Sequence, residues 1–504
     1  MSKDIPEARS LPRHGYSHDQ LLGAMQKMAQ SDADWRAGKT WALVYDAGEA
    51  HREFLKKAHN TFFTENALNP LAFKSLKRME AESVRMIATM LNGDDKSVGT
   101  LTSGGTESIL LACKTYRDRA KWRKPWVRRP EIVAPVTVHV AFEKAAHYFG
   151  MKLRTVPVDK DYRVDMRALK KAVNRNTVMI AASAPHYPQG VIDPIEEIAA
   201  FAKKKKLPFH VDACVGGFIL PFIEKLGYAL PLWDFRVDGV TSISADLHKY
   251  GYAAKGASSV IYRSMDYLKH QFFVSTDWPG GIYASATLPG TRPGGTIAAA
   301  WATLMTLGED GYLDLTRRSM KVRDKLVEGV TDIDGLEVLG RPDAALVSYS
   351  TTAESGLDIF AVADQLEARG WQFDRHQNPN CIHCTCSAGN EAAIEGYLAD
   401  LRDAVEYVRA HPEAAQSGNA AMYGMMAKVP VRGFVKLSVR KIMEGMYGPT
   451  GEVPDLSAIG QSEDDDLLFR LIAKYGEPAM AVFDRVEKAR DALLARVPFV
   501  GKKR

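Results

Sequence analysis

The chain has 504 residues, 46% hydrophobic and 25% charged, with a formal net charge of +5 at pH 7. It can bury a large core in two or three domains, and so small a charge does not indicate a nucleic-acid partner. No apolar stretch is long enough to predict a transmembrane segment, and residues 1–13 lack the apolar centre of a secretory signal. Five cysteines, an odd and small number, favour a cytoplasmic location over a disulfide framework.

The pattern along the chain predicts three parts. Residues 1–60 form an N-terminal arm with a helix over His18–Ala29, residues 61–310 form a large domain, and residues 311–504 form a smaller α+β domain. In the large domain, short apolar runs alternate with amphipathic segments, which predicts an α/β fold with a mostly parallel sheet flanked by helices.

The predicted elements follow one another in chain order. The strands of the large domain are Glu131–Pro135, Lys152–Pro157, Val178–Ser183, Pro208–Asp212, Gly239–Ile243 and Ala257–Tyr262. The helices between them include Phe142–Phe149, Met166–Val173 and Ile195–Lys206. The C-terminal domain has predicted strands at Leu336–Leu339, Ala345–Ser350, Gln372–Asp374 and Ile382–Cys386, a loop over Tyr447–Asp466 and a helix over Leu467–Ala495.

Lys249 follows one of these strands and stands next to His248. A lysine beside another potential cation loses its proton more easily and becomes an amine nucleophile. Such an amine can hold an aldehyde cofactor as a Schiff base, and pyridoxal phosphate is the usual one. Taken alone, the pair can also be a surface lysine beside a histidine.

Three further signals precede this lysine. Asp212 ends a short apolar strand, where its carboxylate can pair with a protonated pyridine nitrogen or cap a turn. The small residues of Thr102–Ser108 run into an apolar segment, and a helix that begins there offers free backbone N–H groups to a phosphate. His139, at the end of another apolar strand, can stack on a flat ring or serve a structural purpose.

These four signals, in this order, resemble the fold-type I pyridoxal-phosphate enzymes, and more narrowly their decarboxylase-like group. Four segments together resemble the sphingosine-1-phosphate lyase family, and the likeness runs over about residues 38–446: Ser103–Ser108, His210–Phe218, Ser244–Gly251 and Arg292–Gly295. The resemblance implies pyridoxal phosphate as the cofactor, with Lys249 as the Schiff-base lysine, Asp212 as the partner of the ring nitrogen and His139 as the stacking residue. The residues that it assigns to the cofactor phosphate are Gly104, Gly105, Thr106 and His248.

The same resemblance implies residues for the substrate. Lys255, six positions beyond the Schiff-base lysine, and Tyr45 match residues that meet the substrate phosphate, and Tyr187 matches a tyrosine near the reacting hydroxyl. The turn Arg292–Thr296, with its glycines Gly294 and Gly295, reaches the cofactor phosphate of the neighbouring subunit in this family. A homodimer with a shared active site is therefore expected.

Two positions depart from the family pattern. The family's Asn-Pro-Leu-His-Pro segment is here residues 66–70, in which Asn66 is kept but Asn69 replaces a phosphate-binding histidine. Gln189 replaces another histidine. Asparagine can donate a hydrogen bond but carries no charge, so these changes affect the expected phosphate affinity and substrate rather than the cofactor chemistry.

The implied reaction is retro-aldol cleavage of the C2–C3 bond of phosphorylated long-chain bases to a fatty aldehyde and phosphoethanolamine. Animal members of the family carry a membrane anchor, so a chain without one is expected to be a soluble form. One alternative is a pyridoxal-phosphate decarboxylase of glutamate or an aromatic amino acid, which needs an anchor for the α-carboxylate, usually arginine. Another is a catalytically silent relative that acts as a binding protein.

Two residue clusters each allow two interpretations. Residues 381–386 contain three cysteines near His376, which can bind zinc or form a strand whose alternation splits the thiols between two faces. The strand is favoured, since no second pair of cysteines completes a site. Residues 117–129 carry seven cations with Trp122 and Trp126, which suits an anionic lipid surface or, the favoured interpretation, a solvated helix end.

Overall fold

The computed structural model describes residues 10–416, 420 and 432–449. Contacts divide the chain into two compact units, one of residues 1–356 and 366–403 and the other of residues 357–365 and 404–504. The cavity described below lies in the first unit. The predicted loop over Tyr447–Asp466 lies outside the described residues from position 450 on, and so does the whole predicted helix over Leu467–Ala495. The three-part division into arm, large domain and small domain stays a prediction.

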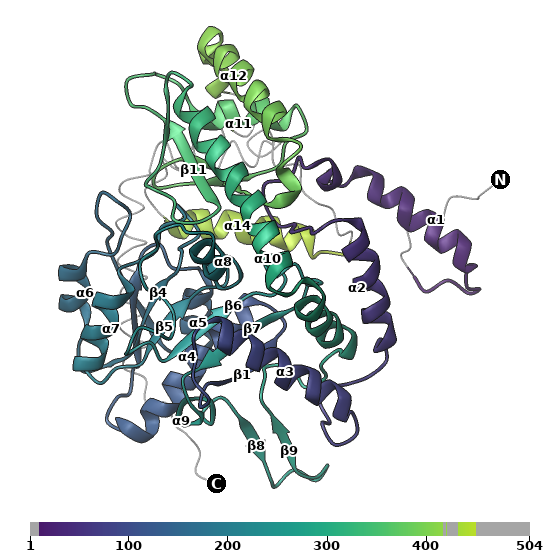
Figure 1. Ribbon diagram of the computed structural model, residues 1–504, viewed down its shortest axis with the longest axis vertical. Coiled ribbons are helices and arrows are strands. Elements are labelled where there is room, and N and C mark those ends of the chain that lie inside the picture. Colours follow the sequence, from purple (N-terminus) through teal and green to yellow (C-terminus); the bar gives the residue numbers. More distant parts are fainter. Residues whose placement is uncertain (1–9, 417–419, 421–431, 450–504) are drawn as a thin grey trace. The chain divides into compact units, whose positions relative to one another are not determined.

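A seven-stranded sheet is the centre of the first unit (Figure 1). Its order is β1 (Val98–Thr102), β7 (Ser258–Tyr262), β6 (Ser242–Ala245), β5 (Phe209–Asp212), β4 (Thr177–Ser183), β2 (Glu131–Pro135) and β3 (Lys152–Val156). The pairs from β6 to β3 are parallel, while β7 runs antiparallel to β1 and β6. The α/β fold with a mostly parallel sheet is confirmed.

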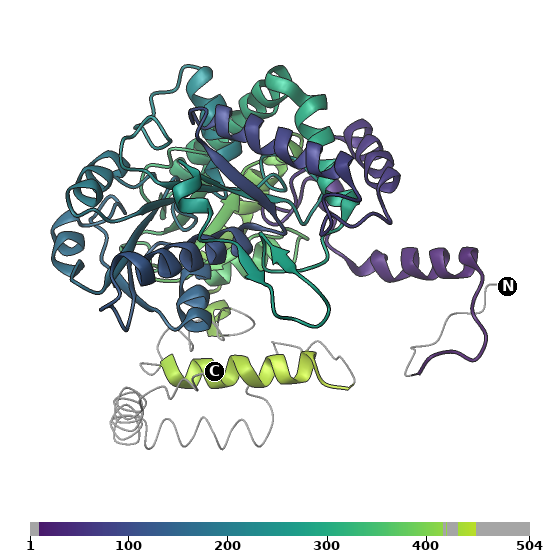
Figure 2. The ribbon, with the colours of Figure 1, turned by 90° about the horizontal axis from the view of Figure 1, so that it is seen from below.

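Every residue of β2, β4, β5, β6 and β7 is buried, so the sheet needs cover on both faces. Figure 2 shows helices above and below the strands. One apolar cluster joins α4 and α5 to the strands through side chains such as Tyr116, Phe142 and Met179. The helices between the strands are α4 (Gly105–Arg123), α5 (Ala141–Phe149), α6 (Met166–Ala172), α7 (Ile195–Lys204), α8 (Leu220–Lys225) and the 3-10 turn η3 (Gly216–Phe218).

Other helices precede and follow the sheet strands. Those before the sheet are α1 (His18–Met28), α2 (Glu49–Thr61) and α3 (Lys74–Met90), with the 3-10 turns η1 (Ala29–Ser31) and η2 (Trp35–Ala37). After β7 come α9 (Met265–Leu268), the hairpin β8 (Phe273–Ser275) and β9 (Tyr283–Ser285), and α10 (Gly294–Thr331). The long helix α10 is interrupted at Gly308, whose φ of 53° is left-handed.

A second, four-stranded antiparallel sheet follows α10. Its order is β10 (Leu336–Val338), β11 (Leu346–Thr351), β13 (Cys381–Thr385) and β12 (Asp374–His376), and the 3-10 turn η4 (Ala388–Asn390) comes after β13. The strand interpretation of the cysteine segment is confirmed, because β13 covers all of its residues except Cys386. All five cysteines of the chain are buried free thiols.

The remaining helices belong wholly or partly to the second unit. They are α11 (Ile359–Glu367), α12 (Ile394–Ala410), η5 (Pro412–Gln416) and α14 (Arg432–Met446). Across the part of the chain that the structure describes, no helix combines the length and the apolar character that a bilayer span needs.

Most predicted strands lie within one or two residues of the observed ones, but four details differ. β1, β8 and β9 were missed, because their sequences show little apolar alternation. The strand predicted over Gly239–Ile243 is β6, which begins only at Ser242. The chain turns first at Gly239, whose φ is 112°, so residues 239–241 do not extend the strand.

Candidate active site

A cavity of about 550 Å³ opens at the carboxyl ends of β4, β5 and β6. Ligands of open α/β sheets bind at this edge. Asp374 and seven of the predicted site residues line the cavity. The seven are Tyr45, His139, Tyr187, Asp212, His248, Lys249 and Lys255. Segments far apart in the sequence therefore meet around one space.

Lys249 lies in the turn that follows β6, and its nearest charge is a carboxylate. Its Nζ is 3.0 Å from Oδ2 of Asp246, which is buried and also accepts a 2.6 Å hydrogen bond from Ser258 Oγ. Burial opposes the positive charge of Lys249, but Asp246 outweighs it and raises the pKa of the lysine. The prediction that the neighbouring His248 makes Lys249 lose its proton more easily was wrong, because the pKa of Lys249 is raised.

Asp246 belonged to the motif but received no role from the sequence. Burial alone would raise the pKa of its carboxyl, whereas the charges of Lys249 and His248 and the Ser258 hydrogen bond lower it, so it stays ionised. The signal that could have found Asp246 is its spacing of three residues before the lysine, which in a helical turn puts both side chains on one side.

Asp212 ends β5, and its carboxylate is held from one side. Its Oδ1 accepts hydrogen bonds from Ser244 Oγ and from the backbone N–H of Cys214, both 3.1 Å long. His210, two residues earlier on the same face of the strand, contacts Ser242 Oγ at 2.8 Å and Ser244 Oγ at 3.3 Å. Ser244 therefore links the buried His210 to Asp212 and fixes the direction of its carboxylate.

The predicted phosphate turn leads from β1 into α4 and lies against the lysine turn. No side chain caps α4 at Gly104, so the first backbone N–H groups of the helix are available to an anion. A Cβ at Gly105 would lie 2.6 Å from Asp246 Oδ2 and 2.8 Å from Cys214 Sγ. A Cβ at Gly104 would lie 3.5 Å from Cε1 of His248. Thr106 follows on the exposed side of the same turn.

Lys255 and Tyr45 meet at another wall of the cavity. Nζ of Lys255 donates hydrogen bonds to the carbonyl oxygens of Leu43, at 2.6 Å, and His248, at 3.2 Å, and it lies 5.2 Å from the centre of the Tyr45 ring. Burial and the charge of Lys249 lower the pKa of Lys255 to about 8. Burial raises the pKa of Tyr45 to about 12, so its hydroxyl stays protonated near neutral pH.

Tyr187 follows β4 and reaches the small sheet. Its hydroxyl donates a 2.5 Å hydrogen bond to Oδ2 of Asp374, the first residue of β12. The sequence reasoning assigned no role to Asp374, since no local pattern connects residues 187 positions apart. His139 faces the same cavity, and its Nδ1 accepts a 3.1 Å hydrogen bond from the backbone N–H of Ala141.

Besides Gly104, Gly105 and Thr106 of the phosphate turn, four predicted site residues do not line this cavity. Asn69 caps the backbone of residues 71 and 72, and Asn66 Oδ1 accepts hydrogen bonds from the backbone N–H groups of Leu68 and Arg292. Gly294 and Gly295 are buried against residues 59–65, where a Cβ would lie within 2.9 Å of backbone carbonyl oxygens. Their assignment to a site shared with a partner subunit stays a prediction.

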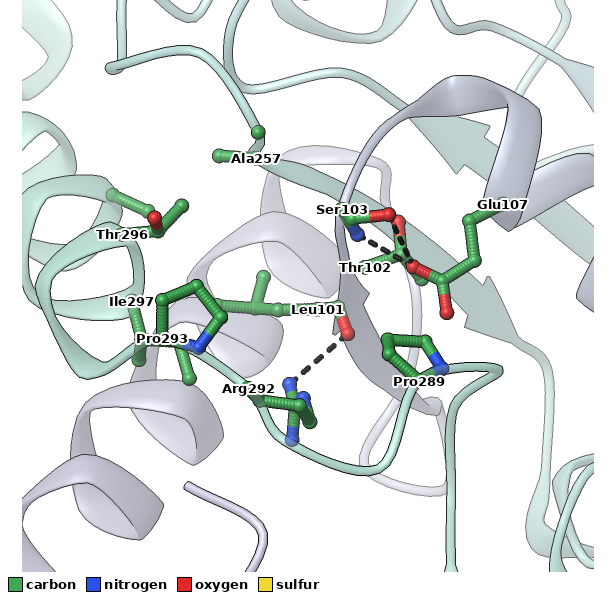
Figure 3. A pocket seen from close by; sticks show the side chains of 12 residues that line it. Leu101, Thr102, Ser103, Glu107, Ala257, Pro289, Arg292, Pro293, Thr296 and Ile297 are labelled. Carbon is green, nitrogen blue, oxygen red and sulfur yellow. Dashed lines mark hydrogen bonds between the residues drawn. The ribbon is translucent and has the colours of Figure 1, made fainter. Parts of the chain in front are cut away.

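The Arg292 turn nevertheless lies close to the phosphate turn of its own chain. A small cavity, with a volume of about 50 Å³, lies there. Figure 3 shows Thr102 and Ser103 on one side of it and Arg292 and Thr296 on the other. Nη2 of Arg292 is bound by Glu80 Oε1 at 2.6 Å and by the carbonyl oxygen of Leu101 at 3.1 Å. The arginine is therefore committed to the structure of its own subunit.

The residues present fit pyridoxal phosphate. An amine, a buried and oriented carboxylate and an exposed histidine lie around one cavity, which matches the aldehyde, ring nitrogen and ring face of the cofactor. Because Gly105 has no Cβ, the first N–H groups of α4 lie close to the turn that contains Lys249, where they can bind a phosphate.

Comparisons with known proteins agree with this geometry. The family described as pyridoxal-dependent decarboxylase conserved domain matches residues 12–352. The sphingosine-1-phosphate lyase of Arabidopsis thaliana is 44% identical over 88% of this chain and 82% of its own length. The sphingosine-1-phosphate lyase 1 of Rattus norvegicus is 45% identical over 84% of this chain and 74% of its own length.

Solved structures point the same way. The sphingosine-1-phosphate lyase of Burkholderia pseudomallei is similar with a TM-score of 0.76 and 38% identity, covering 83% of this chain and 96% of that one. A glutamate decarboxylase of Lactobacillus brevis has a TM-score of 0.71 at 23% identity, covers 81% of this chain and 96% of that one, and shows the shared fold. The chain therefore belongs to the sphingosine-1-phosphate lyase family, within the pyridoxal-phosphate-dependent decarboxylase-like enzymes.

Proposed function

We propose that this chain cleaves the C2–C3 bond of phosphorylated long-chain bases and releases a fatty aldehyde and phosphoethanolamine. The observation that carries the proposal is a single cavity with two lysines of different surroundings, Lys249 beside Asp246 and Lys255 beside Tyr45. The first suits covalent attachment and the second suits a phosphate. The names of the relatives support this substrate class.

Each side chain then has a separate task at the cofactor. When bound, pyridoxal phosphate accepts the electron pair that the broken C2–C3 bond leaves. Lys249 would hold the cofactor through its aldehyde group and would return a proton to C2 of the product. Asp212 would keep a proton on the ring nitrogen, and His139 would stack on the ring. The groups proposed to bind the cofactor phosphate are the N–H groups of Gly104, Gly105 and Thr106, with His248 and, from the partner subunit, the turn that contains Gly294 and Gly295.

The substrate is oriented by charge at one end and by a hydroxyl at the other. Lys255 and Tyr45 bind its phosphate, the lysine as a point charge and the tyrosine as a neutral donor. Tyr187 lies near the hydroxyl on C3. Asn66 and Asn69 are proposed to contribute to the phosphate site from the partner subunit, because neither lines the cavity of its own chain.

The decarboxylase alternative is disfavoured by the cavity wall. Among the described residues, no arginine lines the cavity, whereas an amino-acid decarboxylase usually anchors the α-carboxylate with an arginine. Asp374 instead puts a carboxylate on that wall, and like charges repel strongly in a partly buried site. An amine without a carboxylate on C2 avoids that repulsion.

We also propose a homodimer with a shared active site, and a cytoplasmic location. The shared site is supported by the turn at residues 292–296, which does not line the cavity of its own chain. The location is supported by the cysteines, because five buried free thiols fit a reducing compartment.

The direct test is to incubate the protein with a phosphorylated long-chain base and to detect fatty aldehyde by mass spectrometry. Borohydride reduction followed by peptide mapping should label Lys249, and Lys249→Ala should abolish both label and aldehyde. Lys269→Ala, which changes a surface lysine paired with Asp266, is the matched control and should behave as the unchanged protein. Carbon dioxide release from glutamate or an aromatic amino acid, without any aldehyde, would establish the decarboxylase instead.

A further inference from the structure

The Tyr187 side chain is fixed at both ends. Its ring centre lies 4.3 Å from that of His383 and 5.4 Å from that of His376, so the small sheet holds the ring from one side. His383 is itself held by Ser348 Oγ at 3.0 Å. The hydroxyl has one short hydrogen bond, which it donates to Asp374. The phenol therefore has little freedom to turn toward another acceptor.

This direction of donation decides what Tyr187 can do for a substrate. Burial and Asp374 both raise the pKa of Tyr187, so the phenol keeps its proton near neutral pH and does not act as a phenolate base. The proton points at Asp374, which leaves a lone pair on Oη for a hydroxyl in the cavity. A substrate hydroxyl that donates to Tyr187 thus completes a chain of two hydrogen bonds that ends at a carboxylate.

Within the described residues, Asp374 forms no ion pair, although Lys249 and Lys255 line the same cavity. The titratable groups that face it besides Tyr187 are Tyr45, His376 and Cys384. Burial raises the pKa of Tyr45 and of Cys384 to about 12 each and lowers that of His376, so all three are uncharged near neutral pH.

We propose that Asp374 is the final acceptor of the C3 hydroxyl proton and acts through Tyr187 as a positioning residue for the cleavage step. This inference rests on the proposed function and deepens it. As the C2–C3 bond breaks, its electron pair stays with C2, and the pair of the O–H bond forms the second carbon–oxygen bond of the aldehyde. The hydroxyl proton passes to Tyr187 Oη, and the phenol proton passes to Asp374 Oδ2. The proton on Asp374 is released to water when the aldehyde leaves.

Asp374→Asn tests the step with little change of shape. The amide oxygen can still accept a hydrogen bond from Tyr187, but it takes up a proton far less readily than a carboxylate. We expect kcat for aldehyde release to fall about 100-fold or more, the usual scale for one positioned proton transfer, with KM within about threefold. Asp238→Asn, which changes an exposed carboxylate paired with Lys203, is the matched control and should leave kcat unchanged.

A double-mutant cycle separates action through Tyr187 from a general structural effect. In a Tyr187→Phe background, Asp374→Asn should lower kcat by less than about threefold, because the two side chains work as one unit. Equal losses in both backgrounds would overturn the proposal. Thermal unfolding of the variants shows whether the fold is retained.

A second readout does not need the hydroxyl proton at all. Exchange of deuterium from water into the amine-bearing carbon of phosphoethanolamine depends on Lys249 but involves no C3 hydroxyl. Asp374→Asn should leave this exchange within about threefold of the unchanged protein, since no proton reaches Tyr187 in it. An equal loss of exchange and cleavage would overturn the inference, whereas absence of aldehyde from the unchanged protein would instead overturn the proposed function.

Discussion

The buried carboxylate of Asp246 sets the charge state around Lys249. It lies 3.0 Å from Nζ, and Ser258 holds it in place through a 2.6 Å hydrogen bond. A buried ionised carboxylate needs such partners, because losing them would leave its charge uncompensated. The lysine proposed to bind the cofactor is thus kept in one position before any ligand arrives. His248, next in the turn, is largely buried, and burial lowers its pKa.

Lys255 gives a pH-dependent prediction. Because its pKa is about 8, this ammonium is charged below that pH and loses its charge above it. The KM for a phosphorylated long-chain base should therefore rise about tenfold between about pH 7 and about pH 9, as the charged fraction falls by that factor. Steady-state kinetics across this range measures the effect.

The comparison variant is Lys255→Met, which keeps much of the length but removes the charge. This variant should have a higher KM at neutral pH than the unchanged protein, and its KM should not change as the pH rises further. Lys225→Met, at an exposed lysine paired with Glu309, should follow the unchanged protein. A KM that rises equally with pH in Lys255→Met would refute a role for this charge.

The start of α4 works as a unit with the turn after β6. The helix begins at Gly105 without a side-chain cap, and the turn approaches it so closely that a Cβ would meet Asp246. The N–H groups of α4 and the amine of Lys249 are therefore held at a fixed separation. This arrangement fits a cofactor with a phosphate at one end and an aldehyde beside it.

Gly105→Ala is expected to push these two elements apart. The added methyl would lie 2.6 Å from a buried carboxylate oxygen, and overpacking of this kind costs about 1–3 kcal/mol. Titration with pyridoxal phosphate, followed by absorbance, should show an affinity at least about tenfold weaker. Gly23→Ala, where a Cβ meets nothing within 4 Å, is the control. Unchanged affinity in Gly105→Ala would mean that the turn does not hold the phosphate.

The cavity of the first unit is assembled from the whole length of that unit. Tyr45 belongs to the N-terminal segment, which is tied to the small sheet: Trp41 N–H donates to the carbonyl of Gln372, and Thr385 N–H donates to that of Trp41, both at 2.7 Å. Tyr250, next to Lys249, donates to the carbonyls of Ala345 and Cys386. Arm, large sheet and small sheet are thus joined at the cavity.

A shared active site predicts complementation between inactive subunits. Lys249→Ala removes the lysine proposed to bind the cofactor, and Thr296→Val alters the turn proposed to reach the partner's cofactor. Mixed dimers contain one site with both residues intact, so random exchange should restore about a quarter of the full activity. Aldehyde release before and after mixing and subunit exchange is the measurement. Two Lys249→Ala preparations mixed together serve as the blank, and no recovery with Thr296→Val would argue for independent sites.

Several features could be predicted from the sequence because they follow from local patterns. Short apolar runs predicted parallel strands, and the carboxyl ends of such strands meet at one edge of the sheet. Asp212 and Lys249 were therefore expected together, and both line the cavity. The cysteine segment followed from strand alternation in the same way.

Other features depend on the folded structure, either through contacts between distant segments or through burial. Tyr187 and Asp374 are 187 positions apart, yet their hydrogen bond directs the phenol proton. The pKa of Lys249 was expected to be lowered by His248. In the structure, the buried carboxylate of Asp246 lies beside the amine and raises that pKa instead. Burial and the distance to other charges determine the pKa of a group. The sequence therefore predicted which residue types form the site, whereas their protonation and their partners depend on the tertiary structure.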